Sequence, residues 1–241
     1  MTGGVRLGSD WGQTPQAPLT TIAIICHDYG RYLADAVMSA IGQTRPAHVL
    51  VLDDASSDET PDVIERLAAT HPAIRHRRLA TNHGLARVRG LAAAHATSEW
   101  IVYLDADDWL ASTYVERAEA WLGTHPDVDA LTTDMTIVRS SGRRLVRAAI
   151  PRFWTDLLRR NTIVQTSVIR RRVLLELGGY DPALDYEDWD FWIRLLQSGR
   201  RIGRLPGSHV YHREHGLNKS KVCDERAAAA AVRARHEHLI S

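Results

Sequence analysis

Carboxylates with the spacing of a metal site occur together in one short segment. Asp105-Ala106-Asp107-Asp108 directly follows the apolar run from Trp100 to Leu104. Because side chains alternate along an extended chain, Asp105 and Asp107 can point the same way. Carboxylates this close repel each other, and a hard divalent ion such as Mg²⁺ or Mn²⁺ relieves the repulsion. The segment alone could also be an acidic surface turn that caps the next helix, but its position after an apolar run favours a ligand site.

A second acidic pair, Asp53-Asp54, closes the apolar run from His48 to Leu52. Its carboxylates could accept hydrogen bonds from a base N–H and a ribose hydroxyl. Ser57 or Asp58 could cap the helix that Thr60-Pro61 opens, since proline is tolerated in a first turn. The ligand-binding and capping interpretations are compatible.

A third acidic cluster contains tryptophan, in Tyr186-Glu187-Asp188-Trp189-Asp190. A carboxylate beside an aromatic wall suits a general base, and Trp189 offers a face for a sugar ring. The alternative is that Asp185 caps a helix and that Glu187 and Asp188 interact favourably with its macrodipole.

The segment from His209 to Lys221 combines histidines with basic residues. Its histidines could complete a metal shell, and its basic groups could hold a diphosphate. The alternative is a polar surface loop. Zinc fits the composition less well, because the acidic clusters favour a harder ion.

The apolar runs and the segments of helical periodicity alternate over the first half of the chain. This alternation predicts a parallel sheet with helices on both faces, and in such sheets ligands bind beyond the carboxyl ends of the strands. The acidic clusters should therefore meet at one edge. The expected strands are Thr21 to Cys26, His48 to Leu52, Ile74 to Leu79 and Trp100 to Leu104, and the expected helices include Leu33 to Ile41, one from Thr60, and Leu85 to His95.

The second half continues with mixed elements and gives no sign of an internal repeat. Gly178-Gly179 is a helix stop signal. We expect one α/β domain over 19–221, with a nucleotide-sugar-binding half at 19–110 and an acceptor half at 111–221, a flexible leader at 1–18 and a C-terminal helix at 222–241. The further expected elements are helices at 112–123, 171–177, 188–198 and 224–239, strands at 128–134 and 164–170, and a loop at 210–221.

Composition excludes several classes of protein. With 241 residues, 44% hydrophobic and 24% charged, the chain has the balance of a soluble globular protein. It has no apolar run of the roughly 18 residues that a membrane span needs, and no signal peptide is visible. Two cysteines exclude a disulfide scaffold and a four-cysteine zinc site. We therefore expect a cytoplasmic protein.

Charge is unevenly distributed along the chain. Residues 1–138 carry 10 basic and 18 acidic groups, whereas residues 139–204 carry 14 basic and 7 acidic groups. The acidic half argues against nucleic-acid binding. The basic half could contact an anionic partner or, peripherally, a membrane surface, or it could simply be solvated arginine.

Together these clusters resemble the family 2 glycosyltransferases, which have the GT-A fold. The resemblance runs from about Thr20 to Ser220, and the order of the motifs is the family's own. They are Cys26 to Leu33, Gln43-Thr44, Asp53 to Asp58, Asn82-His83-Gly84, Ala86-Arg87, Leu104 to Asp108, Gly178 to Asp181, Glu187 to Leu195 and Tyr211 to Ser220.

The resemblance implies a nucleotide-sugar donor with uridine as the favoured base, a Mn²⁺ or Mg²⁺ cofactor, and an inverting displacement. The acceptor could be a carbohydrate, a lipid carrier or a natural product. By matched position, the roles fall into four groups. Cys26 (through its backbone), His27, Asp54, Arg87 and Asp105 would hold the nucleotide; Asp107, Asp108 and His215 the metal; Asp188 would be the base with Glu187 beside it; and Gly179 and Trp189 would contact sugar or acceptor.

The sequence departs from the family pattern in three places. His27-Asp28 replaces the usual Tyr-Asn, the loop from Asn82 to Arg87 looks about two residues short, and His212 could replace His215. A nucleotidyltransferase is a rival interpretation, but the segment after the first strand has only Gly30 and Arg31 in place of a glycine-rich basic loop. A non-catalytic nucleotide-sugar-binding protein is a third.

Overall fold

The first half of the chain forms the predicted parallel sheet. The computed structural model describes residues 17–216 and 223–237. Four strands lie in the order β3-β2-β1-β4, all parallel, with Ile25 beside both Leu52 and Asp105. Their carboxyl ends share one edge, which is where the acidic clusters follow. The elements are β1 (Thr20–Cys26), α1 (Gly30–Ile41), β2 (His48–Asp53), α2 (Thr60–Thr70), β3 (Ile74–Arg78), α3 (Leu85–His95) and β4 (Trp100–Asp105).

The second half extends the same sheet with mixed pairing in the order β4-β8-β6-β9-β5, and β7 pairs with β6. β6 and β9 are parallel, whereas β8 is antiparallel to both of its neighbours. Within the described ranges no helix is long and apolar enough to cross a membrane. The elements are β5 (Trp109–Leu110), α4 (Tyr114–Gly123), β6 (Ala130–Arg139), β7 (Gly142–Val146), α5 (Trp154–Arg159), β8 (Val168–Arg170), α6 (Arg171–Glu176), α7 (Glu187–Gln197), β9 (Ile202–Arg213) and α9 (Glu225–Glu237).

The prediction of a loop at 210–221 is wrong for residues 210–213, because β9 continues to Arg213. Tyr211 pairs with Trp109 on one side and with Thr136 on the other. These polar residues are extended because a neighbouring strand lies on each side, a long-range cause that local polarity does not reveal. Residues 217–222, with Lys219 and Lys221, lie outside the described ranges, as does most of the expected leader.

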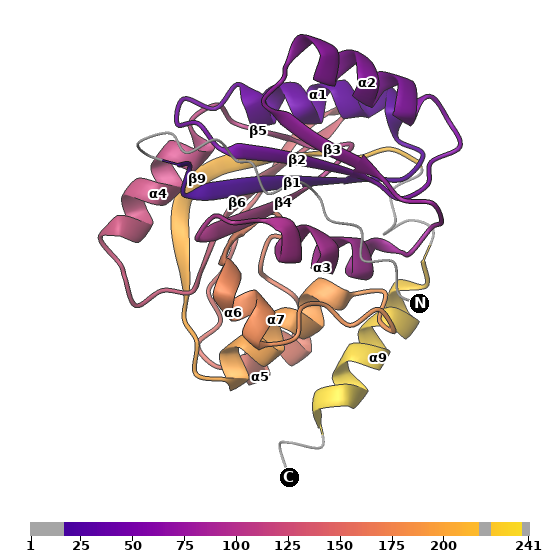
Figure 1. The fold of residues 1–241 in the computed structure, drawn as a ribbon. Helices are drawn as coiled ribbons and strands as arrows, with labels where there is room; N and C mark the ends of the chain where they lie inside the picture. Colours follow the sequence, from indigo (N-terminus) through magenta and orange to yellow (C-terminus); the bar gives the residue numbers. More distant parts are fainter. Residues whose placement is uncertain (1–16, 217–222, 238–241) are drawn as a thin grey trace, which may run out of the picture.

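Helices cover both faces of the sheet (Figure 1). The buried apolar residues form two clusters, one on each face. Along β1, Ile22 and Ile24 pack with α1, α2 and α4, whereas Ala23 and Ile25 pack on the opposite face with α3, α5, α6, α7 and α9. This alternation follows from the two-residue period of a strand. Because both faces are covered, the central strands are continuous apolar runs, as the sequence shows.

The glycine pair ends α6 as the sequence predicts. The Gly179 amide donates to the Leu174 carbonyl at 2.9 Å and the Gly178 amide to the Leu175 carbonyl at 3.0 Å, which is the Schellman pattern. Both glycines have positive φ, at 77° and 70°, a conformation that other residues adopt at a cost. The chain is thereby turned toward α7.

A buried carboxylate joins the last helix to α7. Asp190 is fully buried and accepts from Arg194 Nε at 2.7 Å within α7. Its other oxygen lies 2.9 Å from His236 Nε2 and 3.3 Å from Arg235 Nε, both on α9. A buried carboxylate is costly unless it is paired, so these contacts hold α9 against the helix that begins with Glu187 and Asp188.

Gly30 is required where α1 and α2 approach each other. A Cβ at this position would lie 2.7 Å from the Thr60 amide nitrogen and 3.0 Å from the Glu59 carbonyl carbon, both backbone atoms. We expect Gly30→Ala to lower the free energy of unfolding by about 1–3 kcal/mol, the usual cost of overpacking. Gly90→Ala is the control: it adds a Cβ to helix α3 in open space, and should raise stability by up to about 1 kcal/mol. Urea unfolding measures both, and equal midpoints for the two variants would contradict the prediction.

Candidate functional site

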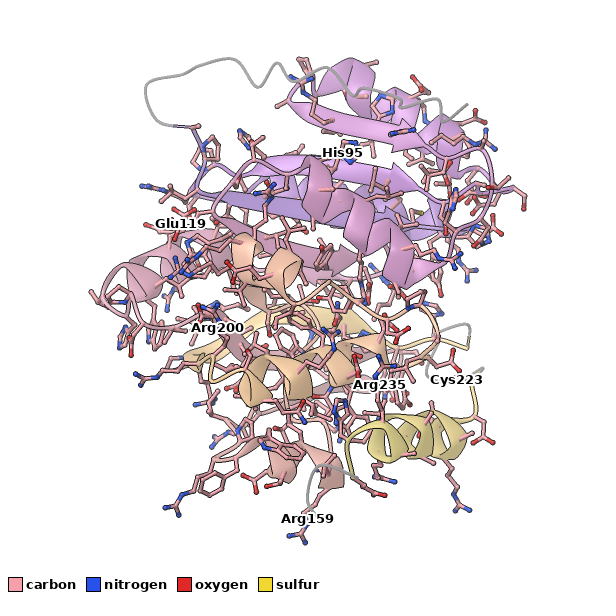
Figure 2. All side chains as sticks on the ribbon, turned by 60° about the horizontal axis from the view of Figure 1, so that its bottom comes forward. His95, Glu119, Arg159, Arg200, Cys223 and Arg235 are labelled. Atoms are coloured by element: carbon pink, nitrogen blue, oxygen red, sulfur yellow. The ribbon has the colours of Figure 1, made fainter. Side chains whose placement is uncertain are left out.

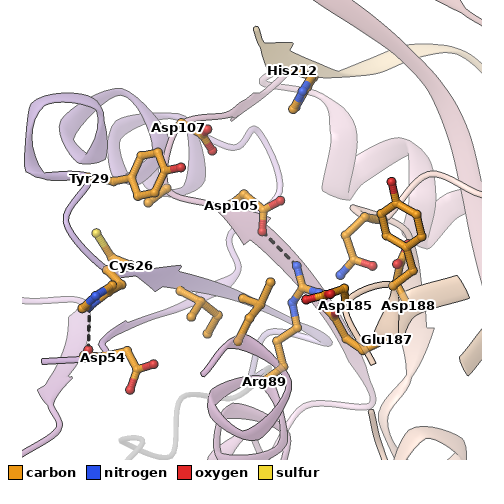
Figure 3. Close-up of a pocket in the computed structure, with 16 residues that line it drawn as sticks. Cys26, Tyr29, Asp54, Arg89, Asp105, Asp107, Asp185, Glu187, Asp188 and His212 are labelled. Carbon is orange, nitrogen blue, oxygen red and sulfur yellow. Dashed lines mark hydrogen bonds and ion pairs between the residues drawn. The ribbon is translucent and has the colours of Figure 1, made fainter. Parts of the chain in front are cut away.

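One cavity of about 400 Å³ lies at the carboxyl ends of β1, β2 and β4 (Figure 3). Residues of α3, β9 and the first turn of α7 complete its walls. Asp107 and Asp188 both line it, although 81 residues separate them in the sequence. The predicted convergence of the acidic clusters at one edge is therefore confirmed.

A buried arginine connects the two acidic walls. Arg89 on α3 is 2% exposed; its Nη2 donates to Asp105 Oδ1 at 2.9 Å and its Nη1 to Glu187 Oε1 at 2.6 Å (Figure 3). The Gln165 amide, oriented with its oxygen toward Arg89, accepts from both nitrogens at 3.0 Å. The fork shape of a guanidinium suits this double contact. Arg89 therefore fixes the end of β4 relative to the start of α7.

On the β1 and β2 side, His27 and Asp54 fix the shape of the cavity wall. His27 Nδ1 donates to the Asp54 carbonyl at 2.8 Å, and Nε2 accepts from Asn82 Nδ2 at 3.0 Å. The two carboxylate oxygens of Asp54 accept from the amides of His83 and Gly84, each at 2.8 Å. Asp54 therefore holds the loop that precedes α3.

Cys26 also lines this wall, but its thiol is no nucleophile. Burial raises the pKa of the Cys26 thiol to about 12, so it stays protonated at neutral pH. Its carbonyl accepts from the Asp54 amide at 2.8 Å, which ties the end of β1 to the end of β2. The expected contact of the Cys26 backbone with a nucleotide stays a prediction.

Asp107 and His215 form the pair that best fits a divalent ion. Asp107 Oδ2 and His215 Nε2 are hydrogen-bonded to each other at 2.9 Å. An ion with bonds of about 2.1 Å could replace this contact with little movement, since two of its ligands at right angles would lie about 3.0 Å apart. Burial, together with the charges of Asp108 and Asp105, raises the pKa of Asp107 to about 6, so a cation here would relieve a real repulsion. Among the described residues no group of three or more histidine, cysteine, aspartate or glutamate side chains is placed to hold an ion.

The expected metal role of Asp108 does not match its position. Its Oδ1 accepts from the Arg213 amide at 2.9 Å and its Oδ2 lies 3.0 Å from His212 Nδ1. The carboxylate is thus occupied in holding β9. Neither Asp108 nor His215 is among the residues that line the cavity, whereas Asp107 and His212 are. Burial lowers the pKa of His212, but the hydrogen bond and charge of Asp108 outweigh it and raise the pKa to about 9. His212 is consequently a cation that faces the cavity, whereas His215 contacts Asp107.

Asp188 stands on the α7 wall with a perturbed carboxyl. Burial and the neighbouring Glu187 charge raise its pKa to about 6, against the opposing effect of Arg89. Its Oδ2 accepts from Asn161 Nδ2 at 3.2 Å. A carboxylate that is ionised at neutral pH but has a raised pKa is suited to accept a proton.

Three expected contacts are corrected by the structure. Arg87 is exposed and does not line the cavity, because helical spacing directs Arg89, two residues on, toward Asp105. Trp189 is 6% exposed and its indole N–H donates to the Leu157 carbonyl at 2.8 Å, so the ring packs in the core and lines a different hollow. Gly179 ends α6, and its carbonyl accepts from Arg194 Nη2 at 2.6 Å.

Sequence reasoning missed several residues that line the cavity: Tyr29, Arg89, Gln165, Asp185 and Tyr186. The signal for Arg89 was present in the apparent two-residue shortening of the loop before Arg87. Counting on to the next arginine gives Arg89. Gln165 follows no recognisable motif, and only the fold brings it to Arg89.

The fold and the cavity together define a GT-A nucleotide-sugar transferase architecture, and comparison with known proteins agrees. Residues 21–176 match the family described as glycosyl transferase family 2. The chain belongs to this family. It is similar to an uncharacterised glycosyltransferase of Nostoc sp., with 26% identity over 82% of this chain and 65% of that protein. It therefore spans just under two thirds of that relative's length.

Solved structures share the fold at lower identity. S. aureus TarS 1-349 in complex with UDP-GlcNAc has a TM-score of 0.73 at 20% identity, over 88% of this chain and 64% of that one. The mannosyltransferase PcManGT of Pyrobaculum calidifontis in complex with GDP-Man and Mn²⁺ has a TM-score of 0.63 at 22% identity, over 93% and 63%. These likenesses confirm the expected α/β fold with a mainly parallel sheet flanked by helices.

Proposed function

We propose that this chain is a metal-dependent, inverting glycosyltransferase that moves a sugar from a nucleotide diphosphate sugar to an acceptor hydroxyl. The observation that carries the proposal is the shared cavity, with Asp105 and Asp107 on one wall and Asp188 on the other. Family membership and the nucleotide sugars held by TarS and PcManGT support it. Uridine is the base we favour.

The nucleotide would bind on the wall formed by β1 and β2. Cys26, His27 and Asp54 line that wall, and Asp105 lies at its edge with a partly exposed carboxylate. Asp105 has one oxygen on Arg89, which leaves the other to accept from a ribose hydroxyl. The wall is held rigid by the Asp54 contacts, so little ordering is needed on binding.

Mn²⁺ or Mg²⁺ would be held by Asp107 and His215 together with the diphosphate. When bound, the ion acts as a Lewis acid that neutralises negative charge on the leaving diphosphate. The positively charged His212 on the neighbouring wall would add to that neutralisation.

Asp188 would act as the base. The acceptor oxygen attacks the anomeric carbon as the bond from that carbon to the diphosphate oxygen breaks, and the acceptor proton passes to Asp188 Oδ. Attack from the face opposite the leaving group inverts the configuration. Glu187 is occupied by Arg89 at 2.6 Å, so its part is to position the first turn of α7.

Loss of the Asp107 carboxylate should remove the metal dependence of donor binding. In wild type, UDP with Mn²⁺ should raise the melting temperature more than UDP alone, because a ligand that binds the native state stabilises it. In Asp107→Ala, Mn²⁺ should add nothing to the effect of UDP. Asp62→Ala, an exposed carboxylate on α2, should keep the wild-type response. An undiminished Mn²⁺ effect in Asp107→Ala would refute the metal role.

Product analysis tests the reaction class directly. With a transferable donor, release of a nucleoside diphosphate supports sugar transfer, whereas release of pyrophosphate would show nucleotidyl transfer. Binding without either product across a broad acceptor panel would favour a non-catalytic protein.

A further inference from the structure

A second hollow, of about 390 Å³, lies on the outer side of Asp188. Asp188 and Tyr186 line both this hollow and the donor cavity, so they form a wall between the two. The Asn161 amide, which donates to Asp188 Oδ2, lines the hollow as well. A group in this hollow can therefore reach the proposed base from the side opposite the donor.

Three arginines give the hollow its chemistry. Arg159 ends α5, Arg160 follows it, and Arg233 projects from α9, which Figure 2 shows at the same end of the molecule as Arg159. In the described part of the chain none of the three forms an ion pair with a carboxylate. Arg233 Nε donates to the Leu158 carbonyl at 2.8 Å, and its guanidinium lies 5.7 Å from the Trp189 ring centroid.

The hollow is lined by more arginines than carboxylates, which favours the binding of an anion. Apart from Asp188, Glu225 is the only carboxylate among the lining residues. Other arginines of the chain, such as Arg170, Arg194 and Arg204, have carboxylate partners of their own. Guanidinium groups that lack such partners and converge on a hollow are suited to a phosphate, which they bind in a forked geometry.

We propose that this hollow receives the acceptor, and that the acceptor carries a phosphate group. The arginines would hold the phosphate while a nearby hydroxyl of the same molecule lies against Asp188. The proposal rests on the glycosyltransferase function and adds to it the class of acceptor. It also gives a function to Arg159 and Arg160, two of the arginines in the basic second half of the chain.

The test uses glycerol 3-phosphate, which places hydroxyls beside a phosphate, with glycerol as its neutral counterpart. Titration calorimetry is run with UDP and Mn²⁺ present, so that the donor cavity is filled. The variant is Arg159→Gln/Arg160→Gln, because both side chains are exposed and, within the described ranges, neither forms an ion pair. The matched control is Arg143→Gln/Arg144→Gln, two adjacent exposed arginines on β7.

Wild type and control should bind glycerol 3-phosphate, the Arg159→Gln/Arg160→Gln variant should bind it at least about tenfold more weakly, and none should bind glycerol. A second experiment tests a phosphate carried by a lipid. It measures co-sedimentation of the protein with phosphatidylglycerol vesicles and compares it with phosphatidylcholine vesicles. Phosphatidylglycerol binding that is lost only in the Arg159→Gln/Arg160→Gln variant assigns the phosphate to a lipid. The proposal is overturned if neither probe binds wild type, if binding is equal in wild type and that variant, or if the control loses as much.

The melting-temperature response to UDP and Mn²⁺ separates this proposal from the function on which it rests. Both double variants should keep the wild-type response, because neither pair of arginines lines the donor cavity. A wild type without that response would refute the donor site, while phosphate binding that depends on Arg159 and Arg160 would leave the hollow as an anion site.

Discussion

Replacing Asp188 with Asn should reduce sugar transfer roughly 10²- to 10⁴-fold, the range that a general base contributes. The amide has the shape of the carboxylate but cannot take the acceptor proton. Donor binding should change little, because Asp188, although it lines the cavity, is not among the residues proposed to hold the nucleotide or the metal. The measurements are the rate of nucleoside diphosphate release and the melting-temperature response to UDP with Mn²⁺.

The pH profile supplies a second readout for Asp188. With a pKa raised to about 6, the carboxylate is ionised at pH 7 and becomes protonated as the pH falls through 6. With Mn²⁺ at saturation, so that the ion keeps Asp107 ionised although its pKa is also about 6, wild-type kcat/KM should fall with decreasing pH below about 6, and the residual activity of Asp188→Asn should lack this acid limb. Activity of Asp188→Asn within a few-fold of wild type would rule out the base assignment.

Replacing Arg89 with Met should lower the free energy of unfolding by about 3–5 kcal/mol, the cost of breaking a buried ion pair from one side. Without the guanidinium, Asp105 and Glu187 face each other across the space that Arg89 fills. Tyr103 and Tyr180, whose ring centroids lie 5.7 Å and 5.6 Å from its Cζ, would lose a packing partner too. Urea unfolding gives the free energy, and transfer activity should be lost at temperatures where the variant is still folded.

Arg87→Met is the matched control, since it removes the same charge from the same helix. Arg87 is exposed, and a substitution there should change stability by no more than about 0.5 kcal/mol. It should also leave donor binding intact. If instead Arg87→Met abolished donor binding while Arg89→Met did not, the resemblance-based assignment of Arg87 would be restored.

The parts of the site that the sequence predicted are those that follow directly from a strand end. A continuous apolar run marks a strand with both faces covered, and the first polar residue after it lies at the ligand edge of a parallel sheet. Asp54, Asp105 and Asp107 were found in this way, and the structure places all three on one cavity. Asp188 came from its acidic and aromatic context and from the resemblance to the family.

The parts that the sequence did not predict depend on contacts between distant segments. The direction of Trp189 is set by the Leu157 carbonyl, 32 residues away, which accepts its N–H. Asp108 is held by β9. The polar residues at the end of β9 predict a loop, and they form a strand because β6 and β5 pair with them. No local pattern carries that information, because tertiary pairing overrides it.

The contact between α9 and Asp190 affects the order in which parts of the fold can form during synthesis on the ribosome. Domains begin to fold while the ribosome is still adding residues. A nascent chain that ends before α9 could already build the sheet and the donor cavity, but Asp190 would lack Arg235 and His236, and the outer hollow would lack Arg233. The proposed donor site can thus form first, and the proposed acceptor surface is complete only when the last described helix emerges.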